Sequence, residues 1–343
     1  MKATFGENRE ADLITALSLV SIPNVARLQI LARVREEGTF ESVASSLSAR
    51  QRDVGKRIYD ECGQRGIEAR CILDPRYPDA LRHTEGAPLT LFIFGNRPEP
   101  ALPDNALAVV GTRAASVPIC QRASLIAHEL ASAGFAIVSG LALGIDGAAH
   151  RGSLEYPSAC PTIAVLAHGL DRVYPSSHQG LAAQIVASGG LLVSEYPPGT
   201  EPLKHHFLAR NRIIAGLSRG VVIVQAGVRS GSLVTAQFAA DFGRDVFIVS
   251  PETGDARYAG GEVMLDQGAI EICSARDVLR EYGIQPPLKD ETGAEIELSV
   301  DEAMVMLGLS QAELLSKELC GEVVRLQGNR VRIKRAPFGS RDL

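Results

Sequence analysis

The sequence lacks any C-x-x-C pair, although it contains six cysteines among its 343 residues. The spacing of these cysteines fits neither a zinc site nor a disulfide framework. We therefore expect buried, reduced thiols and neither a metal nor another cofactor. The motifs G-x-x-x-x-G-K-[ST] and H-E-x-x-H, which would indicate a P-loop nucleotidase or a zinc hydrolase, are also absent.

A run of about eighteen apolar residues, which a membrane-spanning helix needs, does not occur. The first residues, MKATFGENREADL, lack the apolar core of a signal peptide. Long polar tracts and low-complexity segments are missing too, and hydrophobic residues make up 45% of the chain, which excludes global disorder. These features predict a soluble, cytoplasmic protein with no membrane partner.

An excess of positive charge is also missing, because the formal net charge is −5. The overall charge therefore gives no sign of nucleic-acid binding. A local basic site remains possible, since the field at a surface depends on where the charges lie. The segment KHHFLARNR, residues 204–212, gathers such charge where an apolar, helix-like pattern begins.

The length suggests two or three domains, and the pattern of apolar and polar residues changes twice along the chain. Residues 10–75 carry apolar side chains at helical spacing, which predicts an N-terminal helical domain over residues 1–75. A second domain is expected over residues 76–285. A Pro-bearing linker at residues 283–295 leads into a third domain, expected over residues 286–343. Its two short helical patterns and two strands that turn at Gly328-Asn329 have the element order of a small winged helix.

The middle domain has the pattern of a parallel sheet. After a strand near residues 89–94, apolar runs that end in glycine, serine or a polar loop occupy residues 106–111, 135–140, 162–169, 190–195, 220–227 and 245–251. Strands that are apolar throughout and alternate with amphipathic helices are typical of a sheet buried on both faces. The expected fold class is α/β, with a doubly wound, mostly parallel sheet whose ligands bind beyond the carboxyl ends of the strands.

Several loops at that edge offer donors for an anion, because each combines glycine or hydroxyl side chains with the start of a helix. They are GTRAASVP (111–118), SGLALGIDGAAH (139–150) and QAGVRSGSLVTA (225–236), and SEYPPGTEPLKHHFLARNR (194–212) adds the basic segment. The candidate binding residues are Gly111, Thr112, Arg113, Ser139, Gly140, Lys204, Phe207, Arg210, Asn211, Arg212, Ser230, Gly231 and Ser232.

Two other patterns allow a functional interpretation and a structural one. Asp146 and His150 lie four residues apart on one helical face, which would suit acid–base chemistry or a metal. Helix capping by Asp146, with a hydrogen bond from His150, is the interpretation we favour. The loop AHGLDRVYPSSH, residues 167–178, shows no catalytic spacing, and we interpret it as structural.

Taken in order, VVGTRAAS, VSGLALGIDGAAHRGSLE, TIAVLAHGLDRVYPSSH, LVSEYPPGTEP, RNRIIAGLS and SGSLVTAQFAADFGRDVFIV resemble the DprA (Smf) family of DNA-processing proteins. The resemblance implies an extended Rossmann-like fold, an N-terminal domain of the SAM or helix–hairpin–helix type and a C-terminal winged helix. It also implies a homodimer that binds single-stranded DNA, protects incoming strands during natural transformation and loads the RecA recombinase. No catalytic residue is expected. The family's DNA-contacting positions match Arg113, Lys204, Phe207, Arg210 and Arg212.

The sequence departs from the family pattern at three places in this region. Leu143 stands where the family usually has arginine, Gln225 where it usually has glutamate, and FLARNR lacks the usual proline. These departures predict weaker binding of DNA than is typical.

Two other functions stay open at this stage. The fold is also similar to that of nucleotide-binding phosphoribohydrolases, whose catalytic loop carries a glutamate, whereas the corresponding RSGSLVTAQ here has no carboxylate. An assembly factor whose Rossmann-like surface binds only protein is the third interpretation.

Overall fold

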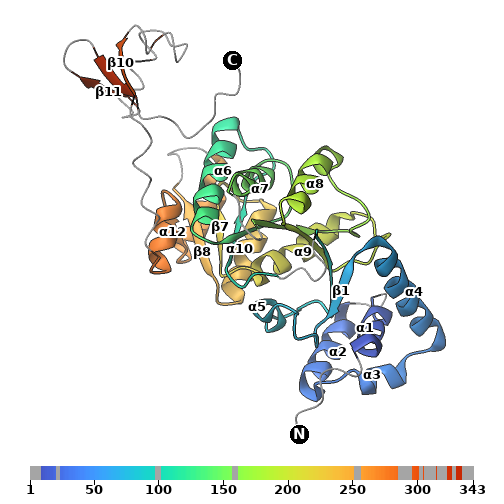
Figure 1. Cartoon of the computed structure of the whole chain (residues 1–343). Coiled ribbons are helices and arrows are strands. Elements are labelled where there is room, and N and C mark those ends of the chain that lie inside the picture. Colours follow the sequence, from blue (N-terminus) through green and yellow to red (C-terminus); the bar gives the residue numbers. More distant parts are fainter. Residues whose placement is uncertain are drawn as a thin grey trace. The chain divides into compact units, whose positions relative to one another are not determined.

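The computed structural model describes residues 9–20, 24–96, 102–156, 161–250 and 256–284, and, nearer the C-terminus, residues 296–300, 304, 314, 323–326 and 330–333. The chain divides into two compact units, Met1–Gln285 and Pro286–Leu343. The first unit contains the predicted sheet, and several of its elements are labelled in Figure 1.

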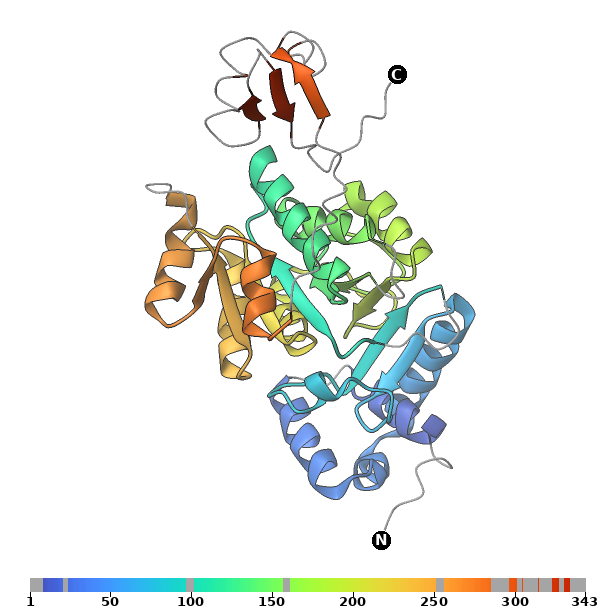
Figure 2. The same cartoon turned by 60° about the vertical axis from the view of Figure 1, so that its left-hand side comes forward.

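Nine strands of the first unit form one sheet in the order β1-β2-β6-β5-β4-β3-β7-β8-β9. Figures 1 and 2 show the sheet with helices packed around it. From β6 to β9 every neighbouring pair is parallel, whereas β1 and β2 run antiparallel to their neighbours. The α/β class with a mostly parallel, doubly wound sheet is confirmed. The strands are β1 (Glu68–Cys71), β2 (Thr90–Phe94), β3 (Ala106–Val110), β4 (Ala136–Ser139), β5 (Thr162–Leu166), β6 (Leu191–Ser194), β7 (Gly220–Ile223), β8 (Asp245–Val249) and β9 (Ile270–Ile272).

Helices cover both faces of the sheet, which explains why its strands are apolar throughout. In β3, Leu107 and Val109 pack in the cluster that contains α6 (Val117–Ser132), α7 (Ile145–Leu154) and α12 (Ala275–Glu281). The alternate residues Ala106, Ala108 and Val110 pack in the cluster that contains α9 (Lys204–Gly216) and α10 (Gly231–Asp241). Three further helices of this unit are α5 (Asp79–Arg82), α8 (Gln179–Ala187) and α11 (Ala259–Asp266), with 3-10 turns at Ser176–His178 and Ala256–Tyr258.

Four helices precede the sheet: α1 (Arg9–Ser18), α2 (Asn24–Glu37), α3 (Glu41–Ser46) and α4 (Ala49–Arg65). The bounds of α4 follow from its caps. Ser48 and Gln51 form a capping box, and Gly66 ends the helix in the left-handed conformation at φ 66°. The prediction of helical structure over residues 10–75 is wrong near its C-terminal end, because Glu68–Cys71 is strand β1. This edge strand forms by pairing with β2, a distant partner that a local pattern does not reveal.

The second unit contains a three-stranded sheet in the order β10-β12-β11, formed by Ile296–Ser299, Arg330–Ile333 and Val323–Leu326. β11 and β12 are antiparallel neighbours in sequence, so the predicted hairpin is confirmed. β10 is a further strand that the sequence pattern did not indicate. The two predicted helical segments, within residues 300–320, lie almost entirely outside the described residues.

The free thiols only partly follow the prediction of burial. Cys62 and Cys71 are buried, Cys120 is half-buried and Cys273 is exposed. Across the described ranges, no group of three or more metal-binding side chains comes together. Within the same ranges, none of the helices has both the length and the apolar character to cross a membrane.

Candidate functional site

The order of the strands reverses between β3 and β7, and the loops that follow these strands begin the candidate site. The two strands are parallel neighbours, so both loops leave the same edge of the sheet. Thr112 N donates to Gln225 O at 2.9 Å, which joins the loops to each other. Open α/β sheets bind their ligands at such a topological switch point.

A groove of about 290 Å³ lies at this point, and we call it the switch-point groove. Its walls come from the loops after β3 and β7, the start of α7, one face of α9 and the N-terminus of α10. Of the residues predicted to bind a ligand, those that line the groove are Gly111, Thr112, Arg113, Phe207, Arg210, Asn211, Ser230, Gly231 and Ser232. The structure therefore brings together most of the predicted set.

Gly111 is needed where the chain turns out of β3 into the groove. A Cβ at this position would lie 2.3 Å from Ile145 Cδ1 and 2.8 Å from Gln225 O. Both distances are far shorter than van der Waals contact, so a side chain would force the two loops apart.

The N-terminus of α10 supplies donors for an anion. Ser230 is the N-cap, and its Oγ accepts from Ser232 N at 3.4 Å. Asn211 Nδ2 donates to Gly231 O at 3.0 Å, which holds α9 against the start of α10. Backbone N–H groups in the first turn of a helix lack intrahelical acceptors, and the helix dipole adds positive potential there. Phosphate-like groups favour such a position.

α9 begins at Lys204, so the basic segment that we predicted as a loop is helical. Residues three, four and seven apart share one face of a helix, which places Lys204 above Phe207, Leu208 and Asn211. The last three of these residues line the switch-point groove. The exposed Lys204 therefore lies one turn beyond the groove, on the same face of the helix.

An arginine and two aromatic rings meet at the mouth of the groove. The Arg113 guanidinium carbon lies 5.3 Å from the centre of the Phe207 ring, within cation–π distance. The Tyr174 ring centre lies 5.5 Å from that of Phe207, and Tyr174 is 46% exposed. Tyr174 comes from the loop that we interpreted as structural. Its signal in the sequence was an aromatic residue in a loop after a parallel strand.

Arg210 lies beneath the groove instead of projecting into solvent, and it is only 3% exposed. Its guanidinium donates to Gly140 O at 2.8 Å, to Val165 O and to Asn211 Oδ1 at 3.2 Å. Burial lowers the pKa of this guanidinium to about 10, against the attraction of Asp146. Arg210 thus joins the ends of β4 and β5 to α9, and its buried position does not match the expected direct contact.

Ser139 and Gly140 shape the site from below and do not line the groove. Ser139 is fully buried, and its Oγ donates to Val109 O at 2.8 Å. A Cβ on Gly140 would lie 2.5 Å from Arg210 Nη2, so glycine is what admits the buried guanidinium.

Arg212 belongs to a different part of the molecule. Its Nη2 donates to Glu195 Oε2 at 2.6 Å, and the residue lines a second pocket together with Ala209. The prediction that Arg212 shares the groove with Arg113 is wrong. The reason is helical phase: at about 100° per residue, Arg212 points away from the face that carries Phe207 and Asn211.

Asp146 and His150 do not form an acid–base pair. Gly144 is the N-cap of α7, so Asp146 does not cap it as predicted; its Oδ2 instead accepts from Gly140 N at 3.1 Å. Burial raises the pKa of Asp146, against the opposing attraction of Arg210. His150 Nδ1 lies 2.7 Å from Thr162 Oγ1, and burial lowers the pKa of its ring to about 3.

A G-x-S-x-G string also occurs, at residues 216–220. It links the end of α9 to β7, whereas a nucleophile elbow leads from a strand into a helix. Ser218 is 1% exposed, and its Oγ donates to Ile214 O at 2.9 Å. This serine therefore has a structural role.

Comparison with known proteins connects this site to one family. Residues 68–283 match the family described as DNA recombination-mediator protein A. Protein Smf of Escherichia coli is 36% identical in an alignment of 287 residues that covers 76% of this chain and 76% of that protein. DNA processing protein DprA of Streptococcus pneumoniae is 42% identical over 211 residues, 62% of this chain and 73% of that protein.

Two solved structures share the fold. DNA processing protein A from Streptococcus pneumoniae superposes with a TM-score of 0.65 and 34% identity, covering 78% of this chain and 96% of that one. DNA processing protein A from Helicobacter pylori, for which a single-stranded DNA binding mode is described, gives a TM-score of 0.54 and 29% identity. That alignment covers 63% of this chain and 95% of the other.

Proposed function

The chain belongs to the DNA recombination-mediator protein A family, and from this membership we propose that its switch-point groove binds single-stranded DNA. One observation carries the proposal: an exposed arginine and a helix N-terminus lie beside a partly exposed aromatic ring at the switch point of the sheet. The arginine and the helix N-terminus can bind backbone phosphates, and the aromatic ring can stack on an unpaired base.

One feature favours a single strand over a duplex. Phe207 and Tyr174 present ring faces beside each other, and a base can stack on such a face only when it is not paired and stacked within a double helix. The positive charge for binding phosphates comes from Arg113, the N-terminus of α10 and Lys204. This local group of donors accounts for DNA binding by a protein whose net charge is −5.

We propose a binding role without catalysis. The groove hydroxyls of Ser230 and Ser232 lie 2.7 Å from each other, and the Asp146 carboxylate accepts a backbone N–H. Neither arrangement activates a nucleophile. The opposing hypothesis, a phosphoribohydrolase, predicts that the protein releases free base from nucleoside monophosphates, and chromatography of such an incubation tests it.

The wider role follows from the family resemblance. We propose that the protein acts in the cytoplasm as a homodimer, protects incoming single strands during natural transformation and loads the RecA recombinase onto them. We also propose that residues 1–75, 76–285 and 286–343 are separate functional domains. Analytical ultracentrifugation without RecA tests the homodimer, and the same measurement with RecA tests whether the two proteins bind.

The experiment that tests the groove measures binding of labelled oligo-dT, and of a duplex of equal length, at several salt concentrations. Arg113→Ala and Lys204→Ala should each weaken binding and reduce the slope of log K against log salt by about 0.7, the value for one phosphate contact on a single strand. Arg276→Ala, on the exposed surface of α12, is the matched control and should leave both quantities unchanged. Wild-type affinity in both Arg113→Ala and Lys204→Ala would rule out this site.

A further inference from the structure

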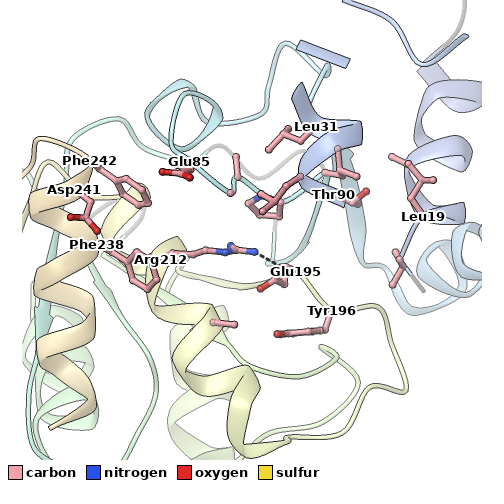
Figure 3. A pocket seen from close by; sticks show the side chains of 18 residues that line it. Leu19, Leu31, Glu85, Thr90, Glu195, Tyr196, Arg212, Phe238, Asp241 and Phe242 are labelled. Atoms are coloured by element: carbon pink, nitrogen blue, oxygen red, sulfur yellow. Dashed lines mark hydrogen bonds and ion pairs between the residues drawn. The ribbon is translucent and has the colours of Figure 1, made fainter. Parts of the chain in front are cut away.

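A second pocket, of about 310 Å³, lies on the opposite side of α9 from the switch-point groove. The end of the α1 segment, α2, the loop before β2, the end of β6 and the faces of α9 and α10 enclose it. We call it the N-terminal pocket. Figure 3 shows Arg212 extending from α9 across its middle, with Phe238 and Phe242 on one side and Leu19 and Leu31 on the other.

The apolar walls of this pocket are suited to a flat ring. Leu19 and Leu31 are buried in the hydrophobic core behind the pocket. Phe238 and Phe242 stack on each other with ring centres 6.0 Å apart and an angle of 25° between their planes. Small-molecule sites of this size commonly combine aromatic and aliphatic walls with a few placed polar groups.

The ion pair in this pocket leaves two of its hydrogen-bonding atoms without partners. The ion pair between Arg212 and Glu195 is made through Nη2 and Oε2 at 2.6 Å (Figure 3). Arg212 Nη1 and Glu195 Oε1 are both buried and have no hydrogen-bond partner among the described residues. The Glu195 side chain is 4% exposed, so an unpaired oxygen there is costly. The pair thus leaves one donor and one acceptor without partners at the wall of the pocket.

The charges at the pocket oppose a phosphorylated ligand. Its charged lining residues are Glu85, Glu195 and Asp241 on the acidic side and Arg212 alone on the basic side. Arg212 is already neutralised by Glu195, while Glu85 and Asp241 are exposed and would repel a phosphate. This balance sets the N-terminal pocket apart from the switch-point groove, which gathers donors for anions.

We propose that the N-terminal pocket binds a neutral nucleobase or nucleoside. Each base carries a hydrogen-bond donor next to an acceptor on its pairing edge. The base donor would pair with Glu195 Oε1 and the base acceptor with Arg212 Nη1, while Phe238, Phe242 and the leucines enclose the ring. Both pockets share α9, but their residues lie on different faces of that helix, so the pocket binds its ligand independently of the DNA strand in the groove.

The experiment titrates the full-length protein with adenosine, guanosine, cytidine and uridine, and with the corresponding 5′-triphosphates, by isothermal calorimetry. We expect at least one nucleoside to bind, and to bind more tightly than its triphosphate. Ala209→Leu extends a side chain into the pocket while keeping both charged residues, and it should weaken this binding by about 10-fold or more. Ala240→Leu, an exposed alanine of α10 outside the lining, is the matched control and should bind as the wild type does.

A second variant tests the polar contact. The double substitution Glu195→Leu with Arg212→Met replaces the buried pair by apolar side chains, which proteins often tolerate without loss of stability. It should reduce nucleoside affinity by about 10-fold or more, because it removes both edge contacts. Oligo-dT binding should persist in Ala209→Leu, and this result shows that the variant is folded and that the groove is a separate site.

Several results would overturn the proposal. Absence of binding by all four nucleosides would mean that the ion pair is satisfied by water alone. Nucleoside binding that survives Ala209→Leu but is lost in Arg113→Ala would place the ligand in the groove. Triphosphates that bind in the pocket as tightly as nucleosides would contradict the role of Glu85 and Asp241.

Discussion

Replacing Arg210 by methionine should unfold the site rather than merely remove a contact with DNA. The substitution removes the donors to Gly140 O, Val165 O and Asn211 Oδ1. It also leaves the buried Asp146 carboxylate without the opposite charge that lowers its pKa. Each buried acceptor left without its donor costs about 1–3 kcal/mol, so the loss of all three should cost about 3 kcal/mol or more. At about 1.7 °C per kcal/mol for a unit of 285 residues, the melting temperature should fall by about 5 °C or more.

Calorimetry or circular dichroism measures the melting temperature, and oligo-dT binding is measured well below it. Arg113→Met is the matched control, because Arg113 lines the same groove but is exposed. Surface substitutions change stability by about 0.5 kcal/mol or less, so this control should melt like the wild type while its DNA affinity falls. The reasoning is refuted if Arg210→Met melts at the wild-type temperature and loses as much DNA affinity as Arg113→Met.

Two further predictions follow from the same region. Phe207→Ala and Tyr174→Ala should each weaken oligo-dT binding by about 1–3 kcal/mol without changing its salt dependence, because stacking releases no counterions; a changed salt slope in either variant argues against stacking. Acid should destabilise the protein through His150, whose folded pKa is lowered from 6.5 to about 3. The unfolded chain therefore binds the proton first, and stability that is complete above pH 6.5 is lost as the pH falls through this window. His150→Leu should reduce the acid-side slope of unfolding free energy by up to about 1.4 kcal/mol per pH unit, as measured by urea unfolding at several pH values; an unchanged slope contradicts the assignment.

The strands and the loops of the site could be predicted from the sequence because their signals are local. An apolar run such as residues 106–110 can only be a strand buried on both faces when helical segments flank it. Parallel strands place their carboxyl ends at one edge, so the loop with Arg113 and the loop with Ser230 were expected together. The groove lined by both confirms that expectation.

The edge strand β1 and the role of Tyr174 could not be predicted in this way. β1 is held by hydrogen-bond pairing with β2, about twenty positions further along the chain, and its four residues carry no clear alternation. Tyr174 is a candidate for stacking only because its ring lies beside that of Phe207, which belongs to another loop-to-helix junction. Both depend on partners that are distant in sequence.

The amino-acid sequence by itself determined that the chain forms a doubly wound sheet and that loops rich in glycine and hydroxyl side chains gather at its switch point. Local hydrophobic periods and glycine positions carry that information, and they act within a few residues. Only the tertiary structure decided the fates of the three arginines around α9. Arg113 is exposed at the groove, Arg210 is buried beneath it and Arg212 pairs with Glu195 in a separate pocket. The physical reason is that the start of α9 and the side chains packed around this helix set the direction in which each arginine points. Neither can be read from the number of positive charges along the chain.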